Sequence, residues 1–370
     1  MSKRTGITIG ILQRVLPDYR IALFDALAEA FPDGCSVFAG KPRSSEGLIA
    51  TGMPKVAQYY SGRNTHLFKE KCYLCLQFGI RGWLNAARPD ILILEANPRY
   101  LRSRVAIRWM QNHGGKIIGW GLGTGNQGAA NVGLRAALRN RFLCSFDALI
   151  TYSAAGARAY QEIGIPADRV FIAPNAATPK PAFVLPDRPQ VYQNGKPVVL
   201  FVGRLQERKR VDVLIEACAQ LPADQQPLLW IVGDGPIRES LQVFSRKIYP
   251  KTEFFGALSG EPLEARFRES DLFVLPGTGG LAVQQAMSFG LPVVVGVADG
   301  TQTDLVRPDN GWILPDDTAS TLSSVLSDAL ADIPRLRKMG AASYRIVSQE
   351  INVERMVTVF RRAVHKVLEE

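Results

Sequence analysis

Cysteine and histidine are scarce in this sequence. Five cysteines and three histidines are spread over 370 residues. Cys72 and Cys75 form a Cys-x-x-Cys pair, but no second pair follows it, which disfavours a zinc site or a redox centre. So few cysteines, in an odd number, are typical of a reduced, cytoplasmic protein.

Long apolar runs are missing as well. None approaches the ~18–20 residues that a membrane-spanning helix needs. The N-terminal run Gly6–Leu12 is short and ends at Gln13-Arg14 without a small-residue cleavage site, so we expect no signal peptide. Internal repeats, low-complexity segments and an Asp-x-Asp metal motif are also absent from the sequence. These absences exclude membrane-spanning and repeat architectures and favour chemistry without a metal.

Acidic residues are under-represented in the first half only. Residues 1–185 hold 23 Lys+Arg against 11 Asp+Glu, a net charge of +12, whereas the whole chain carries +10. This asymmetry predicts an anionic partner, either a phosphorylated ligand or a lipid surface. Nucleic acid is disfavoured, because no basic stretch carries an aromatic stacking motif or a helix-turn-helix pattern. Solvated arginines on a soluble enzyme are the alternative explanation.

What the chain does contain is apolar strand patterns alternating with helical ones. Hydrophobic residues make up 46% and charged residues 21%, enough for packed cores, and the length predicts two domains. Continuous apolar strands separated by helices predict parallel α/β sheets covered on both faces. The Pro-rich stretch Pro179–Pro197 predicts a linker between domains 1–183 and 184–350, with ligands bound in a cleft between them. The expected strands are Ile7–Leu12, Ser36–Ala39, Ile91–Glu95, Lys116–Trp120, Ala148–Tyr152, Val170–Ala173, Val198–Val202, Leu228–Val232, Thr252–Phe255, Leu272–Leu275 and Val293–Gly296.

Two motifs in the second half suit a phosphate ligand. Gly203 permits a tight turn after a strand, and Arg204 and Lys209 follow it before the next helix. The carboxyl edge of a parallel sheet is where phosphates settle, and the two cations suit a diphosphate. The second motif is a strand, then Pro276-Gly-Thr-Gly-Gly280, then a helix, whose free N–H groups form an anion site. Ordinary surface cations and a plain glycine turn are the alternatives.

Several motifs in combination resemble a known family. They are Val202-Gly-Arg-Leu with Lys209, Ile231–Pro236, Phe255-Gly256, Asp271–Pro276 and Ala286–Val293. Together they resemble glycosyltransferase family 4, the retaining group 1 enzymes with the GT-B fold. The first half matches more loosely, through Pro89-Asp90, Ile150–Ser153, Pro174-Asn175-Ala176 and Leu16–Arg20.

The resemblance implies two Rossmann-like, doubly wound domains facing a central cleft, with a C-terminal helix at 351–370 returning to the first domain. It implies sugar transfer from a UDP- or GDP-linked donor to an acceptor hydroxyl, with retention, no cofactor and no metal. Arg204 and Lys209 would hold the diphosphate. The residues expected to bind the donor are Gly203, Gly235, Gly256, Gly277, Thr278, Gly279, Gly280, Leu281, Ala282 and Gln285.

One departure from the family lies in the glycine loop. Group 1 enzymes normally carry two glutamates separated by seven residues, and their positions here hold Gly277 and Gln285. Gln285 still offers a donor and an acceptor to ribose hydroxyls. Because Gly277 has no side chain to contact the sugar, a non-catalytic nucleotide-sugar-binding homologue stays open as an alternative.

The first half supplies the expected acceptor site. Glu95 ends a strand where the family often has histidine, and we expect it to take part in catalysis. Simple pairing with Arg99 or Arg102 is the alternative for Glu95. The residues expected to contact the acceptor are Tyr19, Arg20, Asn97, Arg99, Gly123 and Thr124. Gly123–Gly128 also fits a dinucleotide fingerprint, so an NAD-dependent oxidoreductase is a further alternative, disfavoured because no acidic residue ends the next strand.

Membrane docking is the last expectation. On a helix over Ala129–Ser145, small residues gather on one side and large apolar residues gather opposite, with Arg135 and Arg139 among them. If the small face packs on the sheet, apolar anchors and arginines face an anionic surface. We therefore expect a cytoplasmic protein, peripheral on the inner membrane and acting on a lipid-linked glycan. Burial of the large side chains is the alternative.

Overall fold

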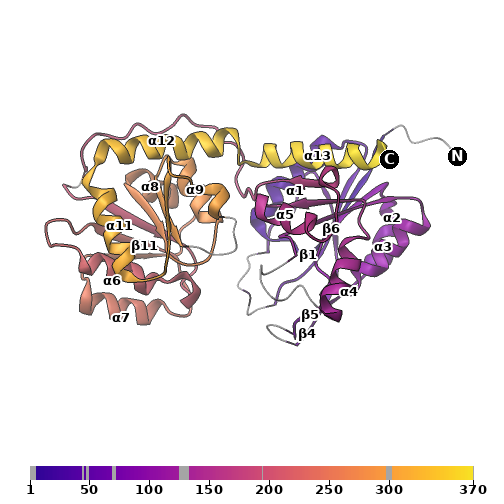
Figure 1. The fold of residues 1–370 in the computed structure, drawn as a ribbon, viewed down its shortest axis with the longest axis horizontal. Helices are drawn as coiled ribbons and strands as arrows, with labels where there is room; N and C mark the ends of the chain where they lie inside the picture. Colours follow the sequence, from indigo (N-terminus) through magenta and orange to yellow (C-terminus); the bar gives the residue numbers. More distant parts are fainter. Residues whose placement is uncertain are drawn as a thin grey trace. The chain divides into compact units, whose positions relative to one another are not determined.

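Two all-parallel sheets organise the chain into two units. The computed structural model describes residues 6–43, 46, 50–68, 72–124, 133–193, 195–296 and 302–369. The first unit comprises Met1–Pro179 with Val353–Glu370, and the second comprises Lys180–Asn352. Figure 1 shows helices flanking the sheet in each unit.

The first unit is built on a seven-stranded sheet in the order β3-β2-β1-β6-β7-β8-β9. Its strands are β1 Ile9–Val15, β2 Cys35–Gly40, β3 Gln58–Ser61, β6 Ile91–Glu95, β7 Lys116–Gly121, β8 Ala148–Thr151 and β9 Val170–Ile172. A separate antiparallel hairpin, β4 Arg63–Leu67 and β5 Leu74–Phe78, leaves this sheet toward the bottom of Figure 1. The strand order reverses between β1 and β6, the position where ligands bind in such sheets.

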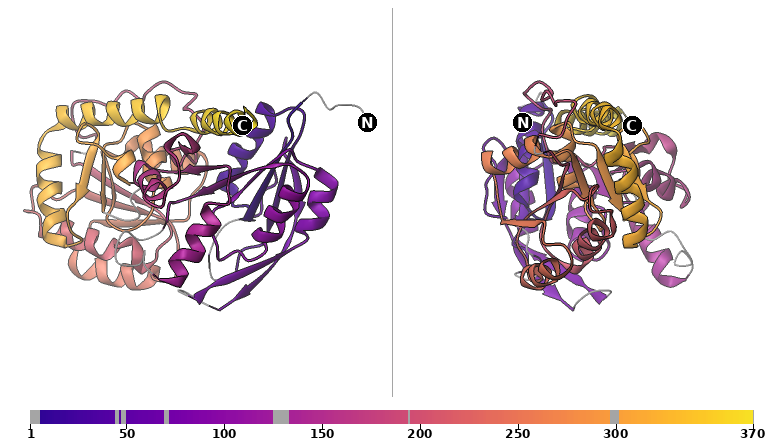
Figure 2. Two further views of the ribbon diagram at one scale, coloured as in Figure 1. Left: turned by 45° about the vertical axis from the view of Figure 1, so that its right-hand side comes forward. Right: turned by 90° about the vertical axis from the view of Figure 1, so that its left-hand side faces the viewer.

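Helices cover both faces of the first sheet. They are α1 Ile21–Ala30, α2 Ile80–Ala87, α3 Ser103–Asn112, α4 Leu134–Leu143, α5 Ala154–Gln161 and α13 Val353–Glu369. Helix α13, yellow in Figure 2, packs against α1 and strands β7, β8 and β9. A separate core cluster joins buried side chains of α2, α3 and α4 to the other face of the strands. Burial on both faces explains why these strands read as continuous apolar runs.

The second unit has a six-stranded sheet in the order β12-β11-β10-β13-β14-β15, the Rossmann order. Helices α6, α7 and α11 lie on one face, and α8, α9 and α12 on the other. The strands are β10 Val198–Val202, β11 Leu228–Val232, β12 Thr252–Gly256, β13 Leu272–Leu275, β14 Val293–Gly296 and β15 Gly311–Leu314. The helices are α6 Val211–Gln220, α7 Arg238–Ile248, α8 Glu261–Glu269, α9 Leu281–Ser288, α10 Gln302–Leu305, α11 Ala319–Ala331 and α12 Ile333–Gln349.

The doubly wound parallel architecture predicted from the alternating pattern is confirmed, with differences at particular strands. Strand β1 continues to Val15, three residues beyond the predicted end. The prediction stopped at Gln13 and Arg14 because they are polar, yet Gln13 is buried and Arg14 forms an ion pair with Glu46. Strands β3, β4, β5 and β15 were not predicted. Most residues of β3 and β4 are exposed or half-buried, so their hydrophobic pattern is weak.

Candidate active site

The loops that follow β10 and β13 meet at the switch point of the second sheet. The first loop ends in a short 3-10 helix, Glu207–Lys209. The Lys209 Nζ donates to the Thr278 carbonyl oxygen at 2.6 Å, and the Thr278 N–H donates to the Arg208 carbonyl oxygen at 3.0 Å. Arg208 Nη1 also donates to Thr278 Oγ1, at 2.9 Å. These bonds join the two phosphate motifs of the sequence into one surface at the carboxyl edge of the sheet.

Glycine is sterically required at two positions of the second loop. A Cβ on Gly277 would collide with the carbonyl oxygen of Arg208 and the backbone of Lys209. Gly279 has φ +145° and lies against the Lys209 ammonium. The position where the family has its first glutamate therefore holds no side chain, because the loop packs directly on the 3-10 helix.

The surface formed by these loops is cationic. Arg204 is exposed, and burial lowers the pKa of Lys209 to about 8, with Arg208 adding a smaller repulsion. Among the described residues, neither Arg204 nor Lys209 forms an ion pair with a carboxylate. Two cations without a counter-ion at this edge suit a diphosphate.

Gln302 positions the glycine loop and was not singled out from the sequence. It is 1% exposed, and its Nε2 donates to the Gly279 carbonyl oxygen at 2.9 Å. In the sequence, nothing marks Gln302 except that it stands at the start of α10, and no motif precedes it. Gln285 lies half-buried on α9, and Gly280 precedes the first turn of that helix, which begins with Leu281 and Ala282.

The other expected donor glycines lie along the same edge. The Gly203 N–H donates to the Val232 carbonyl oxygen at 3.0 Å, and Gly235 packs against the Leu205 backbone. Gly256, with φ +71°, ends β12. A cavity of about 520 Å³ opens beside Gly235, and its other lining residues are Pro236, Arg238, Glu239, Gln242, Val243 and Arg246.

Glu95 lies at the switch point of the first sheet. It ends β6 and accepts a short hydrogen bond from the Arg14 backbone N–H on β1. Burial raises the pKa of the Glu95 carboxyl to about 7, although Arg14 and Arg20 favour its charged form. Neither Arg99 nor Arg102 pairs with Glu95 in the structure, so the simple ion-pair explanation is wrong. A carboxyl group that titrates near neutrality suits proton transfer.

A polar cluster surrounds Arg14 beside Glu95. The Arg14 guanidinium donates Nη1 to both Glu46 oxygens at 3.0 Å, with both side chains largely buried. Tyr73 lies next to this pair, 4.2 Å from the Arg43 guanidinium, and its hydroxyl hydrogen-bonds His66 Nδ1 at 2.9 Å. Sequence reasoning missed this cluster, because its members come from four separate segments without a motif.

The expected acceptor residues do not form one surface. Arg20 is 5% exposed and lies among the rings of Tyr19, Trp120 and Tyr152, with Nη2 donating to Asn175 Oδ1 at 2.6 Å. Tyr19 is 38% exposed. Asn97 Oδ1 accepts from the Arg99 N–H at 3.1 Å and closes the turn after β6. Gly123, with φ +107°, packs on Gly156 of α5, and Thr124 is buried.

The predicted orientation of the helix before β8 is wrong for its C-terminal end, whereas Leu134 and Leu138 are exposed and Ala136 is buried as predicted. Helix α4 begins at Leu134, and residues 125–132, which include Ala129, Val132 and most of the Gly123–Gly128 motif, lie outside the described residues. Phe142 and Leu143, expected on the outer face, are 6% and 1% exposed and belong to the core cluster. Ala137 and Cys144, expected inside, are exposed. Phe142 turns inward to meet Phe146 edge-on at 5.2 Å, since large rings bury more apolar area than alanine does.

The described part of the chain shows no group of three or more His, Cys, Asp or Glu residues arranged to hold a metal ion. None of the helices within it is both long enough and apolar enough to span a bilayer. Its cysteines are all free.

Comparison with known proteins connects this geometry to a family. Residues 187–346 match the family described as glycosyl transferases group 1. A GDP-mannose-dependent alpha-mannosyltransferase of Mycolicibacterium smegmatis is 40% identical over 126 residues, which cover 33% of this chain and 31% of that protein. A sulfoquinovosyl transferase of Arabidopsis thaliana is 35% identical over 117 residues, which cover 31% of this chain and 22% of that protein. The chain thus spans about a third or less of the length of these relatives.

Solved structures agree with the fold along nearly the whole chain. The lipopolysaccharide outer core galactosyltransferase WaaB aligns with a TM-score of 0.71 and 16% identity, covering 97% of this chain and 99% of its own. Sucrose-phosphate synthase from Thermosynechococcus elongatus aligns with a TM-score of 0.72 and 18% identity, covering 98% and 99%. Residues 187–346 therefore resemble a group 1 glycosyltransferase domain, and the chain as a whole has the GT-B fold.

Proposed function

We propose that the protein transfers a sugar from a nucleotide diphosphate donor to an acceptor hydroxyl, with retention at the anomeric carbon. The observation that carries this proposal is the pair Arg204 and Lys209, two cations without a carboxylate partner in the described chain, beside a glycine loop at the switch point. Negative charge develops on the departing diphosphate in the transition state, and fixed cations there lower the barrier. The donor is GDP- or UDP-linked; the mannosyltransferase relative named above uses GDP-mannose.

The glycine loop supplies the remaining contacts of the donor. Gly280 leads into the first turn of α9, where the N–H groups of Leu281 and Ala282 suit the distal phosphate and sugar. Gln285, one turn further along α9, suits the ribose hydroxyls. Because Gly277 has no side chain, backbone groups of this loop recognise the sugar where the family uses a glutamate.

Glu95 is the proposed acidic group of the acceptor side. Its pKa near 7 lets it accept a proton from an acceptor hydroxyl or donate a hydrogen bond to it. Tyr19 follows β1, and Asn97 and Arg99 follow β6, the two strands between which the order of the first sheet reverses. The Arg14 backbone N–H holds the Glu95 carboxylate in place.

A binding and transfer assay tests the donor proposal. We expect Arg204→Ala and Lys209→Ala to bind GDP or UDP more weakly and to lower transfer by two to three orders of magnitude, as about 3–4 kcal/mol for one lost donor requires. Lys247→Ala, an exposed cation on α7, is the matched control and should keep full activity. Unaltered transfer in both site variants refutes the assignment. Nucleotide binding without any transfer supports the non-catalytic homologue, and selective NAD binding supports the oxidoreductase.

Docking on an anionic membrane is the finer part of the proposal, with a lipid-linked glycan as acceptor. The outer face of α4 carries Leu134 and Leu138, which are 77% and 50% exposed, next to exposed Arg135 and Arg141. Apolar anchors between basic side chains suit the headgroup boundary of the cytoplasmic leaflet, each cation adding about 1 kcal/mol near anionic lipid. This face differs from the predicted one, since Phe142 and Leu143 do not belong to it.

Vesicle co-sedimentation tests the docking. We expect binding to anionic liposomes at low salt, weak binding to neutral ones, and loss on Leu134→Gln plus Leu138→Gln or on Arg135→Glu plus Arg141→Glu. Ala137→Gln, on the same exposed stretch of helix, is the control for a change that removes neither charge nor a large apolar group. Equal sedimentation with neutral and anionic vesicles refutes the electrostatic part, and no sedimentation at all refutes docking.

A further inference from the structure

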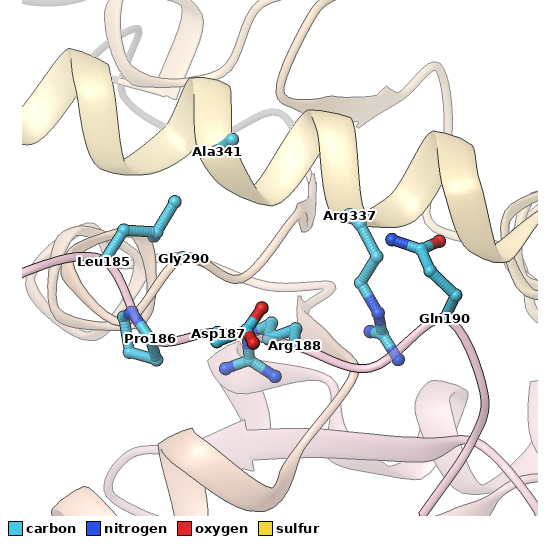
Figure 3. Close-up of a pocket in the computed structure, with 8 residues that line it drawn as sticks. All are labelled: Leu185, Pro186, Asp187, Arg188, Gln190, Gly290, Arg337 and Ala341. Atoms are coloured by element: carbon cyan, nitrogen blue, oxygen red, sulfur yellow. The ribbon is translucent and has the colours of Figure 1, made fainter.

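A cavity unrelated to the donor loops lies in the second unit, under the segment that enters it. The stretch Leu185–Gln190 crosses helix α12 and encloses about 270 Å³ together with Gly290, Arg337 and Ala341. Figure 3 shows Arg337 projecting from α12 toward this stretch, where Arg188 lies. Neither arginine belongs to the site described above.

Arg188 is anchored by backbone oxygens. Its Nη2 donates to the carbonyl oxygens of Phe267 at 2.8 Å and Phe289 at 3.0 Å, and its Nη1 donates to that of Ser270. Its buried Nε has no hydrogen-bond acceptor, and the side chain forms no ion pair with a described residue. The Arg188 charge is therefore fixed in place by backbone carbonyl oxygens rather than by an ion pair.

Arg337 is anchored in a similar way. Only 8% of its side chain is exposed; Nε donates to the Pro189 carbonyl oxygen at 2.9 Å and Nη2 to Asp271 Oδ1 at 2.8 Å. Its Nη1 is buried and lacks an acceptor. Two arginines held rigidly by other bonds thus each keep an unused donor nitrogen.

The charge balance of this cavity favours an anion. Burial lowers the pKa of Arg188 to about 10; repulsion from Arg337 contributes to the same shift, and attraction to Asp271 opposes it. The nearest buried carboxylate, Asp271, is engaged by Arg337 and by the Val198 N–H. Asp187 also lines the cavity but is exposed and forms an ion pair with neither arginine in the described chain. Both arginines line the cavity, and an oxyanion beside them would offset the desolvation of the two buried charges.

We propose that this cavity is a binding site for a small oxyanion of the phosphate class, held between Arg188 and Arg337. Guanidinium groups match tetrahedral oxyanions by charge and geometry. The volume is below the roughly 300 Å³ at which drug-sized ligands begin, so it fits a free phosphate or the phosphate of a small ester rather than a nucleotide. The anion would join the segment 185–190 to α12, and thereby stiffen the chain where it passes from the first unit into the second.

Hydrogen exchange of the full-length protein tests the site, because it reports where the anion acts. Inorganic phosphate, added at constant ionic strength against chloride, should slow exchange of the amides of residues 187, 188, 190 and 191 at least several-fold and saturably. Glycerol phosphate and pyrophosphate are parallel probes that separate a free ion from an ester and from a diphosphate. Slowing confined to the loops at Lys209 and Gly279 would mean that phosphate binds only at the proposed donor site, and would overturn this proposal.

Variants at the rim keep the test independent of folding. Ala341 is exposed on α12, so Ala341→Glu places a carboxylate at the cavity without breaking an arginine bond, and Ala341→Gln is its neutral control. We expect Ala341→Glu to abolish the phosphate effect, Ala341→Gln to keep it, and Asp187→Asn to strengthen it by removing a competing charge. An equal response in all three variants refutes the site, as does the absence of any phosphate effect in the unaltered protein. The outcome does not depend on whether the protein transfers sugar.

Discussion

Replacing Glu95 by glutamine should stabilise the protein and inactivate it. In the folded state the Glu95 carboxyl has a pKa near 7, against an ordinary 4.5, because burial disfavours its charged form. Between those two pH values the folded protein keeps a proton that the unfolded chain releases. The carboxyl therefore opposes folding increasingly as pH rises from 4.5 to 7, and opposes it fully above 7.

The magnitude follows from the two pKa values. Their difference corresponds to about 3 kcal/mol at pH 8, at 1.36 kcal/mol for each pH unit. For a unit of this size that is roughly 6–12 °C in melting temperature. Glutamine stays neutral at every pH and still accepts the Arg14 N–H, so Glu95→Gln should gain this amount at pH 8, about 0.8 kcal/mol at pH 5 and almost nothing below about pH 4.

Thermal melts across pH 5–8 measure this, with Glu29→Gln as the matched control because Glu29 is exposed on α1 of the same unit. We expect the melting-temperature difference between Glu95→Gln and the unaltered protein to grow with pH, while Glu29→Gln shows no such trend. Transfer by Glu95→Gln should fall although the protein is more stable and still binds donor. A melting-temperature difference that does not change with pH would refute the burial argument, and full transfer activity would refute the acceptor-side role.

Three further outcomes are expected. Donor binding by the unaltered protein should weaken above pH 8 as Lys209 loses its proton. The variant Lys209→Arg should bind the donor equally at pH 7 and pH 9, as measured by calorimetry. Parallel pH curves for the two proteins would contradict this. Gly277→Ala should displace the glycine loop and weaken nucleotide binding at least tenfold. Gly82→Ala, where a Cβ meets nothing within 4 Å, should raise the free energy of unfolding in urea by about 0.5–1 kcal/mol. Phe142→Ala should cost about 3–5 kcal/mol in the same experiment and Leu138→Ala close to nothing, since only Phe142 is buried; equal costs would contradict the observed face of α4.

Much of the fold could be predicted from the sequence because both sheets bury both faces. Strands such as Ile91–Glu95 and Val198–Val202 are apolar at nearly every position, and their observed bounds equal the predicted ones. The hairpin of β4 and β5 could not be predicted in this way, because its first strand, Arg63–Leu67, is polar and half-exposed. The hydrophobic pattern of a sequence reflects which residues are buried. A hairpin that is held mainly by pairing between its own strands therefore shows little of that pattern.

The candidate site divides along the same line. Phosphate motifs such as Gly203-Arg204 are contiguous, so sequence alone brings their residues together. Contacts between distant segments leave no such trace: the Gln302 amide reaches Gly279 across 23 positions, and Glu46 meets Arg14 across 32. The orientation of α4 failed for a related reason. Helical periodicity defines two faces, but packing against the core cluster that includes Phe146 decides which of them is buried.

The return of α13 to the first unit has a consequence for the order in which the protein is made. The second unit is one continuous stretch, so it can fold as soon as it has left the ribosome. The first unit cannot finish until residues 353–369 exist, because Phe360 of α13 fills its core against Trp120, with ring centroids 5.0 Å apart. For the time needed to synthesise some 170 residues, the apolar groove beside α1 is open and prone to aggregation. A nascent chain stopped at Asn352 should therefore bind chaperones through its older half while its newer half is already folded.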